Sequence, residues 1–586
     1  MPYLHTLGLE NFRLFKEKAV FDFAPITLLT GQNSSGKSSL IKSLLLMKSS
    51  INETGGIEEL NFSGGKHHLG WYGQVLNFKS ESNELVFTFD FPFPQLVEKT
   101  LIDLTYHSQS RNSLSGKLKA MKIYFESGEI IFEIKKGEKK SEFDYIEDYE
   151  KYDLTHGYSH LYSFYPIEVK CDFRKIIESL RNTYNGKYNG KLISSNPRIK
   201  ELPGLTRHFN RNGIKVSEFV LPHIFINFHI KLFPESNQKS ENTTLFSGVE
   251  ESFQKNFTNQ LDIFSQGIEI EYIFEGGGRY YSESFEDIFL YTLSNILDQL
   301  SIKVNNTGFF ESGAPTKKPT LPLAEFGKFV FEEFFEKELG KSFKSVIDLF
   351  SSVDSLSSFR TNTERLYSST GQMVEMNKLL WEFGQYGENV PYEIREFINN
   401  SLKLFDIGDE MIINTIQGVT SEIFIIKNEK KILLADLGFG YSQLIPIILK
   451  ISLGIIKRAK EDLMTHNIPP TVFLLEEPES NLHPSLQSKL ANFLINAAKE
   501  FNIQFVVETH SEYMIRNFQY LTAKKELDPM STKIYYFNHP DSDEFKNSPL
   551  KEINILEDGR LSAEFGEGFF DEIPRLLAFL YNSSSN

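Results

Sequence analysis

The hydrophobic positions of the chain form two blocks in which strand-like and helix-like segments follow one another. In the C-terminal block, short apolar runs predict strands at 410–418, 421–428, 430–438, 471–477 and 503–510. Longer runs with helical periodicity predict helices at 441–461 and 485–501. In the N-terminal block, the run ITLLTG at 26–31 predicts another strand, and a further helix with apolar periodicity follows it. Strands that alternate with helices predict an α/β fold with a largely parallel sheet.

The N-terminal block also contains segments typical of antiparallel strands. ELVFTFDF at 84–91 is one, and residues 120–136 predict a hairpin that turns at Ser127 and Gly128. We therefore divide the chain into an N-terminal half of the nucleotide fold (1–140), an insertion (141–404), a C-terminal half (405–545) and a tail element (546–586). The insertion is expected to be mainly helical, with helix-like stretches at 284–300 and 326–340 but no sustained heptads.

A glycine-rich loop joins the first strand to its helix. Gly31 to Ser38 has the spacing G-x-x-x-x-G-K-S, in which backbone N–H groups and the lysine bind phosphates and the serine hydroxyl binds Mg²⁺. The nucleotide-binding residues predicted here are Asn33, Ser34, Ser35, Gly36, Lys37, Ser38 and Ser39. The alternative is a Gly/Ser loop that binds nothing, but the strand before it and the helix after it favour a phosphate loop.

The stretch LLEEPESNLHP ends an apolar strand in two adjacent carboxylates, Glu476 and Glu477. Burying two like charges is costly unless a positive group lies nearby. Mg²⁺ is commonly shared between a protein carboxylate and nucleotide phosphates, so this strand end predicts a magnesium site beside the phosphate loop.

Composition and charge narrow the possible partners. The chain of 586 residues has a formal net charge of -16, which argues against non-specific coating of DNA by its whole surface. A basic tract with interspersed tyrosines at 170–215 is a candidate nucleic-acid site, or else a solvated loop that balances the acidic tract at 141–153. The lone Cys171, the absence of a signal-peptide pattern and the lack of a membrane-length apolar run predict a cytoplasmic protein that does not contact membranes.

The order of these motifs resembles the ABC-type ATPase heads of the SMC and OLD families, especially bacterial AAA-annotated ATPases close to OLD. GQNSSGKSSL resembles their Walker A motif, FLLEEPESNLHP their Walker B motif and D-loop, and VVETHSEYMI their histidine switch. DLGFGYSQLIPI, at 436–447, resembles the signature segment. The resemblance implies an ABC/SMC-type P-loop ATPase head with a mixed sheet, interrupted by the insertion.

The resemblance also implies a role for individual residues. Glu477 would be the general base, and His510 would sense the γ-phosphate. Glu476 and Ser38 would hold Mg²⁺, with Gln74 as a Q-loop candidate, and Arg13 would contact nucleotide phosphates. Gly440, Ser442 and Gln443 would complete the site of a second protomer. Each has a plainer interpretation: a helix cap for Ser442, a structural strand-end histidine for His510 and surface packing for Arg13.

The function implied by the resemblance is an ATP-hydrolysing switch that dimerises, or forms a higher oligomer, on nucleotide. It would regulate a separate effector, a nuclease or toxin, as in anti-phage defence. The TOPRIM nuclease domain of OLD proteins has no counterpart after His510, so we expect no nuclease activity from this chain alone. Two alternatives remain: an SMC-like DNA-repair or DNA-structure-binding ATPase, and a scaffold that holds nucleotide without turning it over.

Overall fold

The computed structural model describes two large parts of the chain and short segments between them. The described residues are 3–93, 98–136, 166–171, 272–273, 340–357, 367–368, 375–416, 420–462, 471–540, 542, 545, 548–566, 569–570 and 576–577. The helix-like stretch predicted at 284–300, the acidic tract and nearly all of the basic tract lie outside these residues, as does the stretch at 326–340 except Gly340.

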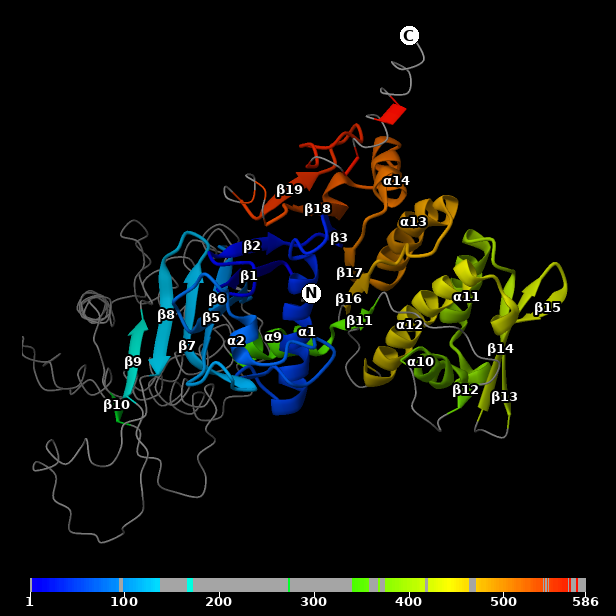
Figure 1. Ribbon diagram of the computed structural model, residues 1–586. Coiled ribbons are helices and arrows are strands. Elements are labelled where there is room, and N and C mark those ends of the chain that lie inside the picture. The colour runs from blue at the N-terminus through cyan, green and yellow to red at the C-terminus, as the bar shows by residue number, and fades with distance from the viewer. Residues whose placement is uncertain are drawn as a thin grey trace, which may run out of the picture.

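A six-stranded sheet forms the centre of the molecule (Figure 1). Its order is β11-β16-β17-β3-β18-β19, and every neighbouring pair is parallel except β18 and β19. The strands are β3 (Ile26–Gly31), β11 (Asp354–Leu356), β16 (Thr471–Glu476), β17 (Ile503–Glu508), β18 (Thr532–Phe537) and β19 (Leu550–Asn554). Strands covered on both faces are apolar almost throughout, which explains their continuous hydrophobic runs.

Side-chain alternation along these strands separates two hydrophobic cores. Val472, Leu474 and Val506 pack on one face with helices α1 (Lys37–Thr54) and α9 (Gly340–Ser351). Their neighbours Leu475 and Val507 face the opposite core. That core is formed by helices α12 (Phe439–Asp462), α13 (Pro484–Phe501) and α14 (Glu512–Ala523). Any side chain that extends the Val506 row therefore points towards α1.

A larger, antiparallel sheet packs beside α1 (Figure 1). Its main order is β10-β9-β8-β7-β6-β5-β1-β2, and β4 pairs with β7. The strands are β1 (Thr6–Glu10), β2 (Ala19–Asp22), β4 (Glu59–Asn61), β5 (Glu84–Asp90), β6 (Thr100–His107), β7 (Ser115–Phe125), β8 (Ile130–Lys136), β9 (Pro166–Cys171) and β10 (Tyr272–Ile273). The predicted hairpin is confirmed as β7 and β8, and Gly128 in its turn has a φ of 92°.

A third, small sheet lies at the far side of α12. It contains β12 (Tyr367–Ser368), β13 (Glu410–Ile416), β14 (Thr420–Lys427) and β15 (Lys430–Leu433). Helices α10 (Glu375–Gly384) and α11 (Tyr392–Leu404) pack with it. The remaining short elements are α2 (Tyr72–Val75) and the 3-10 turns η6 (Gly387–Asn389), η7 (Leu434–Asp436) and η8 (Pro529–Ser531).

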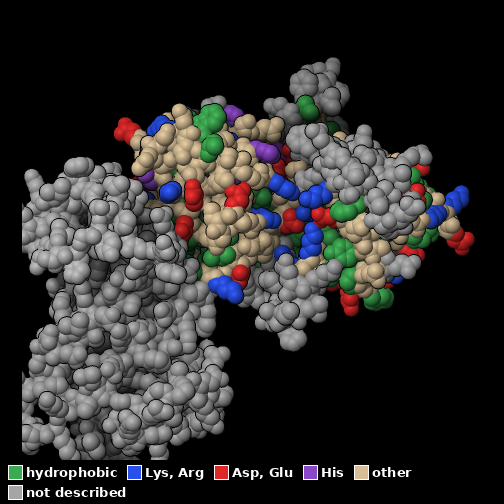
Figure 2. Space-filling view, turned by 90° about the horizontal axis from the view of Figure 1, so that it is seen from below, with side chains coloured by type: hydrophobic (Ala, Val, Ile, Leu, Met, Phe, Trp, Pro, Cys, Tyr) green, Lys and Arg blue, Asp and Glu red, His purple; other side chains and the backbone are tan. Residues whose placement is uncertain are grey.

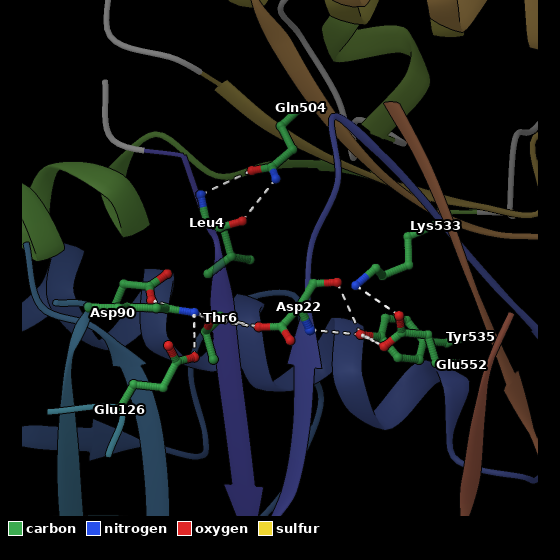
Figure 3. A network of polar contacts seen from close by, with 10 residues as sticks. Leu4, Thr6, Asp22, Asp90, Glu126, Gln504, Lys533, Tyr535 and Glu552 are labelled. Atoms are coloured by element: carbon green, nitrogen blue, oxygen red, sulfur yellow. Dashed lines mark hydrogen bonds and ion pairs between the residues drawn. The ribbon is translucent and has the colours of Figure 1, made fainter. Parts of the chain in front are cut away.

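A polar joint holds the antiparallel sheet to the central sheet (Figure 3). Gln504 exchanges hydrogen bonds with the backbone of Leu4, at 3.0 Å to its N–H and 2.9 Å to its carbonyl oxygen. The Tyr535 hydroxyl donates to the Asp22 carbonyl oxygen at 3.0 Å and accepts from the Asp22 N–H at 2.7 Å. Lys99 lies 3.3 to 3.9 Å from three carboxylates, those of Asp22, Asp90 and Glu126. We call this set of residues the sheet joint.

Cations hold the short edge strand β11 in place. Lys450 of α12 pairs with Asp354 at 2.9 Å, Lys48 of α1 donates to the Val353 carbonyl oxygen, and Arg458 donates to the Ser352 carbonyl oxygen at 3.0 Å. In the view of Figure 2, basic and acidic side chains gather in the middle of the described surface. Although β11 lies within the range predicted as the insertion, it pairs directly with β16. The domain limits drawn from the sequence remain predictions.

The predicted α/β class with a mixed sheet is confirmed, and so are the strands and helices predicted between 410 and 510, with one exception. The strand predicted at 430–438 ends at Leu433, and a 3-10 turn at Leu434–Asp436 replaces its second half. The central sheet is largely parallel, as expected, while the mixed character comes from β19 and from the separate antiparallel sheets. No helix in the described part of the chain is long and apolar enough to span a membrane.

Candidate functional site

The phosphate loop connects β3 to α1 at the carboxyl end of the central sheet. Its backbone has positive φ values at Gly31 (134°), Ser34 (60°) and Gly36 (112°). At Gly31 an ideal Cβ atom would lie 2.4 Å from the Phe537 carbonyl oxygen, so only glycine fits beside β18. This turn leaves the first N–H groups of α1 directed at the space in front of the loop, where they can bind an anion.

A cavity of about 740 Å³ opens in front of this loop. Its walls include all seven predicted loop residues together with Arg13, Leu14, Gly73, Gln74, Leu76, Phe78, Glu477 and Glu508. Arg13 and Gln74 reach it because their two segments are joined. The Arg13 N–H donates to the Val75 carbonyl oxygen at 2.7 Å, and the Asn77 amide donates to the Arg13 carbonyl oxygen at 2.6 Å. Residues predicted from distant motifs thus surround one cavity.

Lys37 is buried at the base of the loop, with its side chain 3% exposed. Its ammonium donates to the carbonyl oxygens of Gly31 at 3.0 Å and Gln32 at 2.7 Å. Burial lowers the pKa of Lys37, whereas the carboxylates of Glu508 and Glu477 raise it. A buried ammonium with two carboxylates and a loop of N–H groups around it is suited to contact phosphate oxygens.

Three carboxylates meet at the ends of β16 and β17. Glu476 and Glu508 are register partners across these parallel strands, and Glu508 continues the Val506 row towards α1. Glu477 follows with a φ of 43°; its N–H donates to the Glu508 carbonyl oxygen at 2.8 Å, and its carboxylate accepts from the Ser480 hydroxyl at 2.9 Å. Glu477 and Glu508 line the cavity, and Glu476 does not.

Glu508 is the site residue that our sequence prediction missed. The Ser38 hydroxyl lies 3.1 and 3.3 Å from its two carboxylate oxygens, and the Lys37 ammonium lies 4.0 Å away. Burial raises the pKa of Glu508 to about 7, against the lowering effect of Lys37, and the nearby Glu476 and Glu477 raise it further. The signal was present, because Glu508 ends an apolar strand just as Glu476 does, but only the histidine of VVETHS was weighed.

His510 lies two residues beyond β17, in the turn before α14. Its backbone N–H donates to Glu479 at 2.6 Å, and Ser511 caps α14 by accepting from the Met514 N–H. The His510 side chain is exposed and does not line the cavity. Partial burial and the positive charge of Lys37 lower the pKa of His510, while Glu477 raises it. Because His510 follows Glu508 by two residues, it lies at the same end of β17 as the cavity.

The predicted signature residues lie at the start of α12. Gly440 is next to the Asn481 carbonyl oxygen and Leu482, and Gln443 is buried at 1% exposure. The side chain of Ser442 lies outside the described residues. Neither Gly440 nor Gln443 lines the cavity. Within one chain, the two signature residues whose side chains are described therefore lie outside the wall of this cavity.

The oxygens at the phosphate end of the cavity suit a Mg²⁺ ion that is shared with a nucleotide. Among the described residues, no group of three or more His, Cys, Asp or Glu side chains is placed to hold a metal by itself. Mg²⁺ is generally bound by only one or two carboxylates together with substrate phosphates and waters. The Ser38 hydroxyl and the adjoining Glu508 carboxylate are hard oxygen donors of this kind.

An α/β sheet with a phosphate loop at its carboxyl edge defines a P-loop nucleotide-binding protein. The chain belongs to the AAA ATPase domain family, whose profile matches residues 3–515. A second profile, described as a protein of unknown function (DUF3696), matches residues 527–580 and overlaps the predicted tail element. A search of curated proteins finds no match.

Solved structures similar to this chain include three SMC heads. The Smc head bound to the C-winged helix domain of ScpA is 10% identical, with 94% of this chain and 97% of that chain covered and a TM-score of 0.34. The Pyrococcus furiosus Smc head with an extended coiled coil, bound to the C-terminal domain of ScpA, is 11% identical. The match covers 99% of this chain and 100% of that chain, with a TM-score of 0.31. The Thermotoga maritima SMC head is 10% identical, with 96% of this chain and 99% of that chain covered and a TM-score of 0.32. Values this low support no assignment of activity or partner.

Proposed function

We propose that this chain binds Mg²⁺ and ATP in the cavity in front of the phosphate loop and hydrolyses the bond between the β- and γ-phosphates of ATP. The observation that supports this most strongly is that Arg13, Gln74, Glu477 and Glu508 surround one cavity with the loop residues. Membership of the AAA ATPase domain family supports it independently. Burying a lysine and two carboxylates beside a loop that binds nothing would cost free energy without serving a function.

Each residue has a distinct task in this proposal. Lys37 and the loop N–H groups bind phosphate oxygens, and Arg13, which lines the same cavity, contacts the phosphates as well. Glu477 orients a water molecule and accepts its proton, while Ser480 holds the carboxylate in place. His510 hydrogen-bonds to the γ-phosphate. Ser38 and Glu476, with Gln74, are the predicted Mg²⁺ ligands, and the bound ion would neutralise charge that develops on the phosphates.

Two protomers would complete each site. Gly440 and Gln443 do not line the cavity of their own chain, and this agrees with a sandwich dimer in which the start of α12, with Ser442, would meet the nucleotide of the partner. We propose that this nucleotide-dependent dimer is a switch that regulates a separate effector, a nuclease or toxin of an anti-phage system. The effector and the defence role are supported only by the resemblance of the motifs.

Replacing the proposed general base tests ATP binding and ATP hydrolysis separately. Glu477→Gln keeps the size of the side chain but removes its basicity, so we expect ATP turnover to fall by about 10²–10⁴ while ATP binding persists. A matched control is Glu512→Gln, which removes an acid bound to Arg516 at the start of α14. Steady-state phosphate release and an equilibrium ATP titration measure the two quantities.

The same variant also reports on the oligomer. Because it binds ATP without consuming it, Glu477→Gln should accumulate as the ATP-bound dimer, and light scattering should give twice the protomer mass with ATP and Mg²⁺. Wild-type turnover in the variant would mean that the base lies elsewhere. A protomer mass at saturating ATP would argue against the sandwich dimer.

A further inference from the structure

Glu508 lines the cavity, but the proposed function gives this carboxylate no task of its own. Its side chain is 8% exposed and lies beside Ser38 and Lys37, the two loop side chains proposed to meet the metal and the phosphates. A packing role alone would be met by an apolar residue, as it is at Val506 on the same face of β17.

Three carboxylates lie close to one another at this end of the cavity. Glu476 is the register partner of Glu508 on β16, Glu477 follows Glu476, and burial and the charges of both raise the pKa of Glu508. The Lys37 ammonium lies 4.0 Å from Glu508, and Lys42 of α1, whose pKa is lowered by burial, is near enough for Glu476 and Glu508 to raise that pKa. A nucleoside triphosphate would bring several more negative charges to the same end of the cavity. Like charges at such short range repel strongly in a partly buried site, and a divalent cation is the group that would relieve the repulsion.

Of the two strand-end carboxylates that face α1, Glu508 is the one in contact with the phosphate loop. The Ser38 hydroxyl lies 3.1 Å from one of its oxygens, whereas Glu476 does not line the cavity. A metal that binds the Ser38 hydroxyl would therefore meet Glu508 directly. Glu476, one strand further away from β3, would act from behind it.

We propose that Glu508 is a positioning residue that makes nucleotide binding conditional on a divalent cation. When no divalent cation is bound to the triphosphate, the Glu508 carboxylate repels it from Lys37 and Ser38. When the triphosphate carries a divalent cation, the same carboxylate helps to hold that cation. This inference rests on the proposed function, since it requires ATP to bind in the same cavity.

The test compares ATP affinity with Mg²⁺ and with EDTA, in the full chain at pH 8. In the wild type, removing Mg²⁺ should weaken ATP binding strongly. In Glu508→Gln, ATP alone should bind better and Mg²⁺–ATP less well, so the ratio of the two dissociation constants should shrink by on the order of tenfold. Isothermal titration calorimetry gives both constants without relying on turnover.

Two further variants serve as controls. Glu552→Gln removes another carboxylate of the central sheet, one paired with Lys533 at 3.0 Å, and should leave the ratio at its wild-type value. Glu508→Asp retains the charge and should keep most of the Mg²⁺ dependence. If Glu508→Gln does not fold, Glu508→Asp decides the matter, because a ratio reduced by tenfold with the charge present would overturn the proposal.

The failures of the two proposals are distinguishable. If wild type binds Mg²⁺–ATP and Glu508→Gln shows the wild-type ratio, the role of Glu508 is wrong and the ATP site stands. If both constants rise by the same factor in Glu508→Gln, the residue is merely structural. If wild type binds no ATP under either condition, the proposed function fails and this inference fails with it.

Discussion

Lys37 and Lys99 both lie beside carboxylates, yet their surroundings differ. Lys99, in the sheet joint, is 34% exposed and has three carboxylates within 3.9 Å as well as the Thr6 hydroxyl at 2.5 Å. Lys37 is 3% exposed, donates to two backbone carbonyls and has its nearest carboxylate at 4.0 Å. The Lys99 cluster is a partly exposed group of charges on the antiparallel sheet, next to the buried hydrogen bonds of Gln504 and Tyr535 that join this sheet to the central one. The phosphate site instead buries its charges, among them Lys37 at 3% and Glu508 at 8% exposure, beside an open cavity.

The backbone shows the same difference. Around the cavity, three residues other than glycine have positive φ values: Arg13 (51°), Ser34 (60°) and Glu477 (43°). None of the residues that form the sheet joint does. Strained backbone of this kind costs about 1–3 kcal/mol at each position and tends to persist where a binding site requires it. The comparison therefore distinguishes the phosphate site, which we propose binds a ligand, from the sheet joint, which stabilises the fold. Variants of the two lysines can test this distinction.

The largest expected effect is on ATP binding by Lys37→Ala. Removing one partner of a buried, charge-assisted contact costs about 2–5 kcal/mol, so ATP affinity should fall by on the order of a thousandfold. Lys119→Ala is the control, since Lys119 pairs with Glu84 on the antiparallel sheet at 2.8 Å and does not line the cavity. We expect it to change affinity by no more than about threefold. A titration in which Lys37→Ala retains wild-type affinity would exclude the phosphate-loop assignment.

The next effect is on stability and comes from Glu508. Its pKa rises from 4.5 to about 7 in the folded chain, so folding favours the protonated form. The resulting stabilisation is fully present below pH 4.5 and is lost as the pH rises through about 7. A shift of this size corresponds to about 3 kcal/mol.

The measurement is urea unfolding without nucleotide or Mg²⁺, at several values from pH 5 to pH 8. Because glutamine does not titrate, the free energy of unfolding of wild type should fall relative to that of Glu508→Gln as the pH rises. Parallel curves for the two proteins would show that the carboxyl is not held in the buried environment described here.

Local pattern was enough to predict much of the fold, because the central strands are apolar runs bounded by turn residues and their helices are periodic. It could not predict β11, where three residues, Asp354 to Leu356, show no period and are defined by pairing with β16 more than a hundred positions away. Long-range pairing of this kind leaves no trace in a short window of sequence.

The candidate site divides in the same way. Lys37 and Ser38 follow from the spacing of the loop, and Glu477 from the paired carboxylates together with the family resemblance; the structure brings all three to one cavity with Arg13 and Gln74. Glu508 was missed because its meaning depends on which face of β17 it occupies and on which strand lies next to it. The contact with Ser38 joins residues 470 positions apart. Only the sheet order supplies that neighbour.

The smallest expected effect is that of Lys99→Met in the sheet joint. The exposed pairs with Asp22 and Glu126 contribute little, because solvent screens them, but Asp90 is only 17% exposed and loses its nearest cation. Burial already raises the pKa of Asp90 and Lys99 lowers it, so the variant should lose about 1 kcal/mol of unfolding free energy at pH 7. Asp90→Asn should recover part of that loss in the double variant, which urea unfolding can show as a coupling energy. ATP affinity should stay within about twofold of wild type, since the joint holds sheets rather than ligand. If Lys99→Met weakened ATP binding as much as Lys37→Ala does, the joint and the phosphate site would be energetically one unit, and the contrast between the two lysines would be wrong.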